Sequence, residues 1–158
     1  MEAFAAEHVE AFDVAFAAYV LEHVPDPQEF TAACFRVLKP GGSFFGLTPN
    51  VLQYFGATTW ALARIGLSDR VLQALKGHEA GHVHHFPPEY RLNSIRRITR
   101  HFDAEGFRSV EFRCFDATER YQWYFPPTLG WFPPTYTRLA YGLGAANLMG
   151  HLSFQAVK

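Results

Sequence analysis

The strongest constraint on the fold lies in residues 12–50. An apolar run at residues 12–20, FDVAFAAYV, is interrupted only by Asp13. A run that is apolar on both alternations is typical of a β-strand covered on both faces. A helix signal and a second apolar run follow after short connections. Strand, helix and strand in this order favour a parallel sheet, so we expect an α/β fold.

The helix signal in this stretch starts at Asp26. Asp26 is a side-chain acceptor for the first N–H groups, Pro27 suits the first helical position, and Glu29 completes a capping box. One apolar face follows at helical spacing, made of Phe30, Cys34, Val37 and Leu38. We expect the Pro-Gly-Gly sequence at 40–42 to end this helix and residues 43–48 to form the next strand.

A later helix is expected to start at Asn93 or Ser94, with Ile95, Ile98 and Phe102 on its inner face. Gly106 suits the position after its last turn, where Phe107 would contact Phe102.

Residues 12–50 also carry a phrase known from one family. The sequences LEHV at 21–24, VLKPGG at 37–42 and PN at 49–50 stand in order. As a run they resemble the fourth strand, following helix and fifth strand of class I S-adenosylmethionine-dependent methyltransferases (methyltransferase type 11-like). GHVHHFPPE at 81–89 resembles the phrase that precedes the family's penultimate helix. The resemblance covers residues 12–106 well and the remainder by pattern.

The resemblance implies a partial Rossmann-like sheet. Its strands would resemble numbers 4-5-7-6 of the family, with an antiparallel last strand, helices on both faces and an aromatic insertion. The family's Gly-rich cofactor turn has no counterpart before residue 12, because the first glycine is Gly41. We therefore expect residues 1–158 to form a single truncated methyltransferase-like domain. Its expected parts are a strand-helix-strand core at 12–50, a helical, His-rich lid at 51–92, a helix and strand at 93–115, the aromatic insertion at 116–150 and the last strand at 151–157.

The resemblance further implies an enzyme, an S-adenosylmethionine-dependent methyltransferase whose acceptor is a small, hydrophobic molecule. Ala17 and Ala18, at the end of the first strand, would let the cofactor approach closely; the alternative is close packing in the core. His23 would lie at the mouth of the crevice, where an imidazole suits a proton acceptor. The alternative for His23 is a loop residue bonded to backbone.

The acceptor side of the expected cleft has three candidate residues. Asn50 follows the second strand and either orients the substrate or caps the next helix, and Tyr54 and His82 complete this set. His82 also belongs to an H-E-x-x-H pattern with His78 and Glu79. Zinc chemistry would require one continuous helix there, and the surrounding glycines and prolines oppose it, so no metal is expected.

Two further segments have open interpretations. Residues 116–150 are rich in aromatic side chains, which would complete the core, line an apolar substrate pocket or lie at a membrane surface. The Pro-Pro pairs at 126–127 and 133–134 are expected to exclude regular structure, with one helix over residues 137–149. Arginines 91, 96, 97 and 100 are typical of a solvent-exposed helix face, with an RNA or anionic-lipid contact as the alternative.

Composition limits the partners. The formal net charge of −1 does not indicate a nucleic-acid-binding surface. Two cysteines with no disulfide pattern favour the cytoplasm, and neither a signal peptide nor a transmembrane segment is indicated. A second function stays open: a non-catalytic, degenerate half-domain. It would associate with itself or with a partner chain through the apolar edge of strand 12–20.

Overall fold

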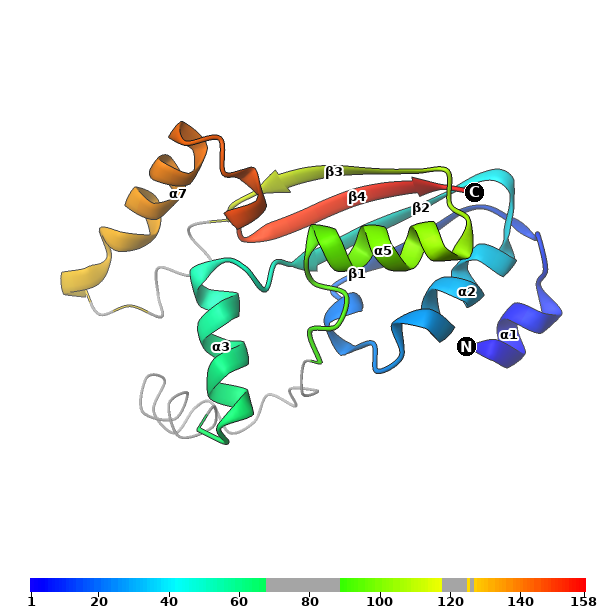
Figure 1. Ribbon diagram of the computed structural model, residues 1–158, viewed down its shortest axis with the longest axis horizontal. Helices are drawn as coiled ribbons and strands as arrows, with labels where there is room; N and C mark the ends of the chain where they lie inside the picture. Colours follow the sequence, from blue (N-terminus) through cyan, green and yellow to red (C-terminus); the bar gives the residue numbers. More distant parts are fainter. Residues whose placement is uncertain (68–88, 118–124, 126) are drawn as a thin grey trace.

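The computed structural model contains one four-stranded sheet with the order β1-β2-β4-β3 (Figure 1). It describes residues 1–67, 89–117, 125 and 127–158. Strands β1 and β2 run parallel, and β4 pairs antiparallel with both β2 and β3. The strands span Phe12–Ala18 (β1), Leu38–Pro49 (β2), Ser109–Phe115 (β3) and His151–Val157 (β4). The predicted 4-5-7-6 order with an antiparallel last strand is confirmed.

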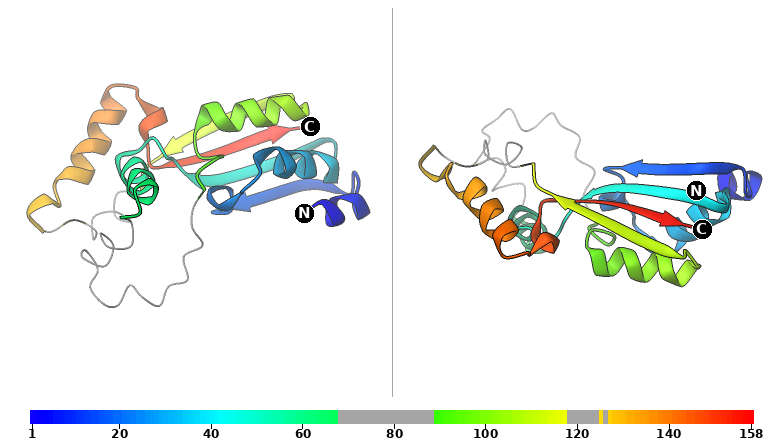
Figure 2. Two further views of the ribbon diagram at one scale, coloured as in Figure 1. Left: turned by 60° about the horizontal axis from the view of Figure 1, so that its bottom comes forward. Right: turned by 90° about the horizontal axis from the view of Figure 1, so that it is seen from above.

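Two of the described helices pack on the sheet, and two others lie beyond its end. Their bounds are Glu2–Glu7 (α1), Pro27–Val37 (α2), Tyr54–Arg64 (α3), Ile95–Glu105 (α5) and Phe132–Gly142 (α7). Single 3-10 turns span Leu21–His23 (η1), Pro127–Leu129 (η3) and Ala146–Leu148 (η4). Helices α2 and α5 pack side by side under the strands, whereas α3 and α7 lie beyond the end of the sheet (Figure 2). Within the described part of the chain, no helix has the length and apolar character needed to cross a membrane.

Helix α2 begins where the sequence predicts, but it ends earlier than the sequence predicts. An oxygen of Asp26 accepts hydrogen bonds from the backbone N–H groups of Gln28 at 2.9 Å and Glu29 at 3.0 Å. The predicted end at residues 40–42 is wrong, because Leu38 is already extended and starts β2. Gly42 instead lets β2 pass close to β1: a Cβ on Gly42 would lie only 3.1 Å from the Asp13 carbonyl oxygen of β1.

Helix α5 follows the predicted pattern at both ends. Ser94 is its N-cap, and Gly106 ends it in the left-handed conformation with φ of +99°. The Phe107 N–H donates to the Phe102 carbonyl at 3.2 Å, and the two rings lie 4.9 Å apart. The predicted glycine stop with its apolar contact is confirmed.

The core lies between α2, α5 and one face of the sheet. Phe44 of β2 is its centre, with ring centroids 6.0 Å from Phe30 of α2 and 5.2 Å from Phe102 of α5. Phe154 of β4 lies over Gly46, where a Cβ would come within 2.1 Å of its ring. Gly46 is therefore required by close packing rather than by backbone conformation.

The opposite face of the sheet is open at its β1 side. Residues paired in register share a face, so Val14, Phe16 and Ala18 lie beside Phe45 and other side chains of β2. Val14 is 55% exposed, Phe16 79% and Phe45 42%. The expectations that β1 is covered on both faces and that helices lie on both faces are not met by the described residues. The physical reason is that α2 and α5 both pack on the other face (Figure 2).

The open face becomes polar away from β1. Its β4 side chains include Ser153 and Gln155, and its β3 side chains include Glu111 and Arg113. Gln155 Nε2 donates to the hydroxyl of Ser43 at 3.1 Å. The half of the open face formed by β3 and β4 is therefore a polar surface that solvent can cover, whereas the half formed by β1 and β2 is apolar.

The aromatic insertion contains a helix that begins earlier than expected. Helix α7 starts at Phe132 and holds Pro133 and Pro134 in its first turn, so the exclusion of regular structure at this Pro-Pro pair is wrong. Proline is tolerated there because the first N–H groups of a helix have no partner within the helix. The helix ends at Gly142, and η4 continues the chain to β4.

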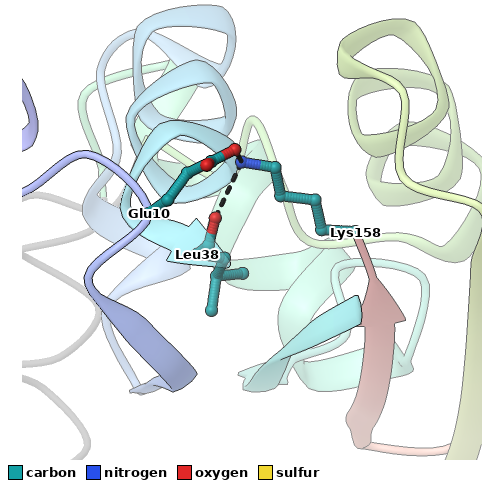
Figure 3. Close-up of polar contacts among 3 residues, drawn as sticks. All are labelled: Glu10, Leu38 and Lys158. Atoms are coloured by element: carbon teal, nitrogen blue, oxygen red, sulfur yellow. Dashed lines mark hydrogen bonds and ion pairs between the residues drawn. The ribbon is translucent and has the colours of Figure 1, made fainter. Parts of the chain in front are cut away.

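The C-terminal residue Lys158 ties three parts of the fold together (Figure 3). Its ammonium group donates to the Leu38 carbonyl at 2.7 Å and lies 3.3 Å from a carboxylate oxygen of Glu10. It also lies 4.6 Å from the centre of the Phe35 ring. These contacts fix the junctions α1–β1 and α2–β2 against the end of β4.

Candidate functional site

The carboxyl ends of β1 and β2 meet at one edge of the sheet. The last residue of β1, Ala18, pairs with Leu47 of β2. The next N–H, from Tyr19, still donates to the Leu47 carbonyl at 2.9 Å, and the positive φ of Tyr19, +56°, then turns the chain out of the sheet. In α/β sheets this end of parallel strands is where ligands bind.

The two predicted cofactor residues lie on opposite faces at this end. Ala17 is buried on the face covered by helices, and Ala18 is exposed on the open face. Both side chains are single methyl groups, so the strand end presents little bulk on either side. Ala18 is therefore the more accessible of the two for a ligand.

A buried polar network lies directly behind this edge. Glu22, in η1, is buried and its carboxylate accepts from the Thr48 hydroxyl at 3.5 Å. Asn93 Nδ2 donates to that hydroxyl at 2.5 Å and to the Pro49 carbonyl at 3.0 Å. The Glu22 carbonyl accepts from the N–H groups of Glu89 at 2.7 Å and Tyr90 at 3.1 Å. The network therefore holds residues 89–93 against the ends of β1 and β2.

Sequence reasoning missed the role of Glu22, Thr48 and Asn93 in this network. Glu22 was read only as part of the LEHV phrase, and Asn93 only as a helix start. No local sequence pattern could have found the network, because its residues come from η1, from the end of β2 and from the segment before α5.

Burial raises the pKa of the Glu22 carboxyl above its ordinary value. The hydrogen bond with its own backbone, the neighbouring His23 and the Thr48 hydroxyl each act in the opposite direction but do not cancel the effect. The folded chain thus holds a proton on Glu22 more firmly than the unfolded chain does.

We expect this proton to make stability depend on pH. Because the folded-state pKa is raised, the stabilisation is present at low pH and is lost as the pH rises through that pKa. Glu22→Gln removes the titration and keeps an acceptor for Thr48, so its free energy of unfolding should exceed that of the parent at pH 8 and approach it near pH 4. Urea denaturation across this pH range measures the difference, with Glu111→Gln, at an exposed position of β3, as control. Parallel pH profiles for the parent and Glu22→Gln would contradict this role.

The predicted catalytic and substrate residues differ in accessibility. His23 is exposed at the end of η1, beside the edge described above. Asn50 is buried: its amide donates to the carbonyls of Asn147 at 2.7 Å and Met149 at 2.8 Å, and its oxygen accepts from the Leu52 N–H at 3.0 Å. The alternative that Asn50 caps the next helix is wrong, because the N–H groups of Phe55 and Gly56 in the first turn of α3 donate to Gln53 Oε1 at 2.8 Å and 3.4 Å. The polar atoms of Asn50 instead hold the chain after β2 to the chain before β4.

Tyr54 lies in an aromatic cluster at the start of α3. Its ring is 4.8 Å from Tyr136, 5.1 Å from Phe132 and 6.0 Å from Phe125. Burial raises the pKa of Tyr54 to about 12, with a further contribution from the charge of Asp116. The hydroxyl is therefore protonated at neutral pH and acts as a hydrogen-bonding group rather than as a base.

The remaining predicted residue, His82, lies outside the described residues, as do His78 and Glu79 of the H-E-x-x-H pattern. Across residues 1–67, 89–117, 125 and 127–158, no group of three or more His, Cys, Asp or Glu side chains could hold a metal ion.

Part of the chain matches a known protein family. The family described as "Methyltransferase domain" matches residues 2–46. The chain is 38% identical over 81 residues to the ubiquinone biosynthesis O-methyltransferase of Cronobacter sakazakii, covering 51% of this chain and 32% of that protein. It is 53% identical over 49 residues to that of Pseudomonas fluorescens strain SBW25, covering 31% and 21%. The matches thus span a third or less of the length of these curated relatives.

Solved structures share the fold. An S-adenosylmethionine-dependent methyltransferase of Thermotoga maritima has a TM-score of 0.57 and 13% identity, over 95% of this chain and 57% of that one. A phosphoethanolamine N-methyltransferase 2 of Haemonchus contortus, in complex with phosphomonomethylethanolamine and S-adenosylhomocysteine, has a TM-score of 0.50 and 15% identity, over 96% and 34%.

The sheet has the fold of part of a class I S-adenosylmethionine-dependent methyltransferase, and residues 2–46 match the family described as methyltransferase domain. The curated relatives of the chain include the ubiquinone biosynthesis O-methyltransferases named above.

The residues present fit one side of the family's cofactor. The exposed methyl group of Ala18 leaves room beside the strand end. Two buried polar atoms at this end, Asn93 Oδ1 and Gln53 Nε2, have no hydrogen-bond partner among the described residues. A polar ligand or water would satisfy an acceptor and a donor of this kind. Residues 1–11, before β1, contain no glycine and therefore no counterpart of the family's Gly-rich turn.

Proposed function

We propose that the carboxyl end of β1 and β2 is one wall of an S-adenosylmethionine cleft, and that the protein serves methyl transfer to a small, hydrophobic acceptor. The observation that carries this proposal is the exposed Ala18 at the end of β1, where the chain turns out of the sheet at Tyr19. The family match and the ubiquinone O-methyltransferase relatives support the reaction class.

In this proposal the chain's own residues mainly position ligands. When bound, the cofactor supplies the electrophilic methyl group, and the protein aligns it with the acceptor. Ala17 and Ala18 permit close approach, and His23 is the exposed imidazole nearest in sequence to the cleft that suits removal of a proton from an acceptor. Tyr54 and its aromatic neighbours offer an apolar surface for the acceptor.

Titration calorimetry with S-adenosylhomocysteine tests this proposal. We expect a saturable heat for the parent chain. Ala18→Phe fills the space above the strand end and should weaken binding by at least about tenfold, or about 1.4 kcal/mol. Ala104→Phe adds the same ring at an exposed position of α5 and is the matched control. No heat and no thermal shift for the parent would remove cofactor binding by this chain.

A second candidate function rests on the apolar half of the open face. Strand β1 is at the end of the sheet order, and Phe16 on it is 79% exposed. An exposed apolar edge strand favours association with another strand. A non-catalytic half-domain that associates with itself or with a partner chain through β1 would explain this surface.

A further inference from the structure

A groove between α3 and α5 concentrates positive charge. It has a volume of about 630 Å³ and is lined by Pro27, Trp60, Arg64, Glu89, Arg91, Arg97, Arg100 and His101. Four of these side chains are guanidinium groups and one is a carboxylate, although the whole chain has a formal net charge of −1. The charge is therefore gathered here rather than spread over the surface.

Most of this charge is not neutralised by the described residues. Glu89 pairs with Arg91 at 3.3 Å. No ion pair within the described ranges involves Arg64, Arg97 or Arg100. Three guanidinium groups facing one hollow repel one another, which costs free energy in the empty groove and favours a bound anion.

Two of the guanidinium groups are held in position by neutral partners. Arg97 donates to the Tyr90 carbonyl at 2.6 Å. The guanidinium of Arg64 lies 4.7 Å from the centre of the Trp60 ring. Both contacts restrict the side chain without removing its charge, so less side-chain entropy is lost when an anion binds.

The start of α5 adds to the same potential. Its first turn contains no acidic residue and begins with Ile95, Arg96 and Arg97, although acidic residues are favoured at a helix N-terminus. A second hollow of about 420 Å³ shares Arg97 and Arg100 with the groove and also contacts Ser94 and Arg96. Helix dipole and side-chain charge thus have the same sign at one place, which would favour an anion.

We propose that the groove binds the phosphate monoester of a small molecule. A dianionic phosphate can accept paired hydrogen bonds from several guanidinium groups at once. The Trp60 ring, on the same wall, provides a flat apolar surface for the organic part of the ligand. S-adenosylmethionine carries no phosphate, so this site is separate from the proposed cofactor wall and does not depend on it.

Phenyl phosphate is the probe for this site, measured by titration calorimetry at low ionic strength. We expect saturable binding that weakens as salt is added, and no binding of phenol. The double variant Arg64→Gln/Arg100→Gln should bind at least tenfold more weakly, because each substitution removes a guanidinium group that can bind the phosphate. Arg113→Gln, an exposed arginine on the open face of β3, should bind within about twofold of the parent, since it lies outside the groove.

Three outcomes would overturn the proposal. The first is no binding of phenyl phosphate by the parent chain, and the second is equal binding by the double variant. The third is sedimentation with anionic phospholipid vesicles without binding of phenyl phosphate, which would mean that the groove serves a lipid surface instead. Thermal melting of the variants by circular dichroism checks that they fold, and the S-adenosylhomocysteine titration reports separately on the cofactor wall.

Discussion

Replacing Phe16 with lysine is expected to convert an associating chain into a monomer. Phe16 is 79% exposed on the strand at the end of the sheet, with exposed Val14 and Phe45 beside it. A lysine at this position makes burial of the edge costly, since its charge would lose its water. Light scattering after size exclusion should give at least twice the chain mass of 17.9 kDa for the parent and 17.9 kDa for the variant.

Leu143→Lys is the matched control for this experiment. Leu143 is 80% exposed at the end of α7, a helix that lies beyond the end of the sheet. The same change there should therefore leave the mass of the associated parent chain unaltered. A parent chain that is monomeric and well behaved at the concentrations tested would contradict association through β1. The apolar half of the open face would then be exposed to solvent in the monomer.

Phe44→Ala is expected to have the largest effect on stability. Phe44 is buried between α2, α5 and β4, in contact with the rings of Phe30, Phe102 and Phe154. Removal of a buried phenyl ring costs about 3–5 kcal/mol through lost burial and the cavity left behind. Domains of this kind have a free energy of unfolding of about 5–15 kcal/mol, so such a loss would be a large fraction of the total. The free energy of unfolding from urea denaturation measures it.

The next residue along the strand provides the control. Phe45 points to the open face and is 42% exposed, so Phe45→Ala should cost less than about 1 kcal/mol. Equal losses at the two positions would contradict the assignment of the covered and open faces. If the chain associates through the open face, the Phe45→Ala comparison is made in the Phe16→Lys background, where the face is exposed in every molecule.

The parts of the fold that were predictable depend on local sequence. The start of α2 at Asp26 and the glycine stop of α5 at Gly106 are confirmed because capping groups act within a few residues. The errors also have physical reasons. The Pro-Pro pair at 133–134 does not break the helix, because proline suits a first helical turn. Gly41 and Gly42 do not end α2: Gly41 has a positive φ of +80° within β2, and Gly42 permits close packing of β2 against β1.

The candidate site was less accessible to sequence reasoning. Ala17 and Ala18 are predicted as small residues at the end of the strand that the family resemblance implies, and the structure places Ala18 at an exposed strand end. The network of Glu22, Thr48 and Asn93 joins residues up to 71 positions apart along the chain, so no local pattern reveals it. The exposure of Phe16 likewise depends on which face α2 and α5 cover, and that is decided by tertiary packing rather than by the run FDVAFAAYV.

The most direct test of the cofactor wall is hydrogen–deuterium exchange, read by mass spectrometry with and without S-adenosylhomocysteine. Our account predicts slower exchange with the ligand in peptides that cover Tyr19 to Val24 and Asn50 to Gln53, at the carboxyl ends of β1 and β2, and unchanged exchange in β3. Protection confined to β3 and α7, or no change at a ligand concentration that saturates the calorimetric signal, would contradict it.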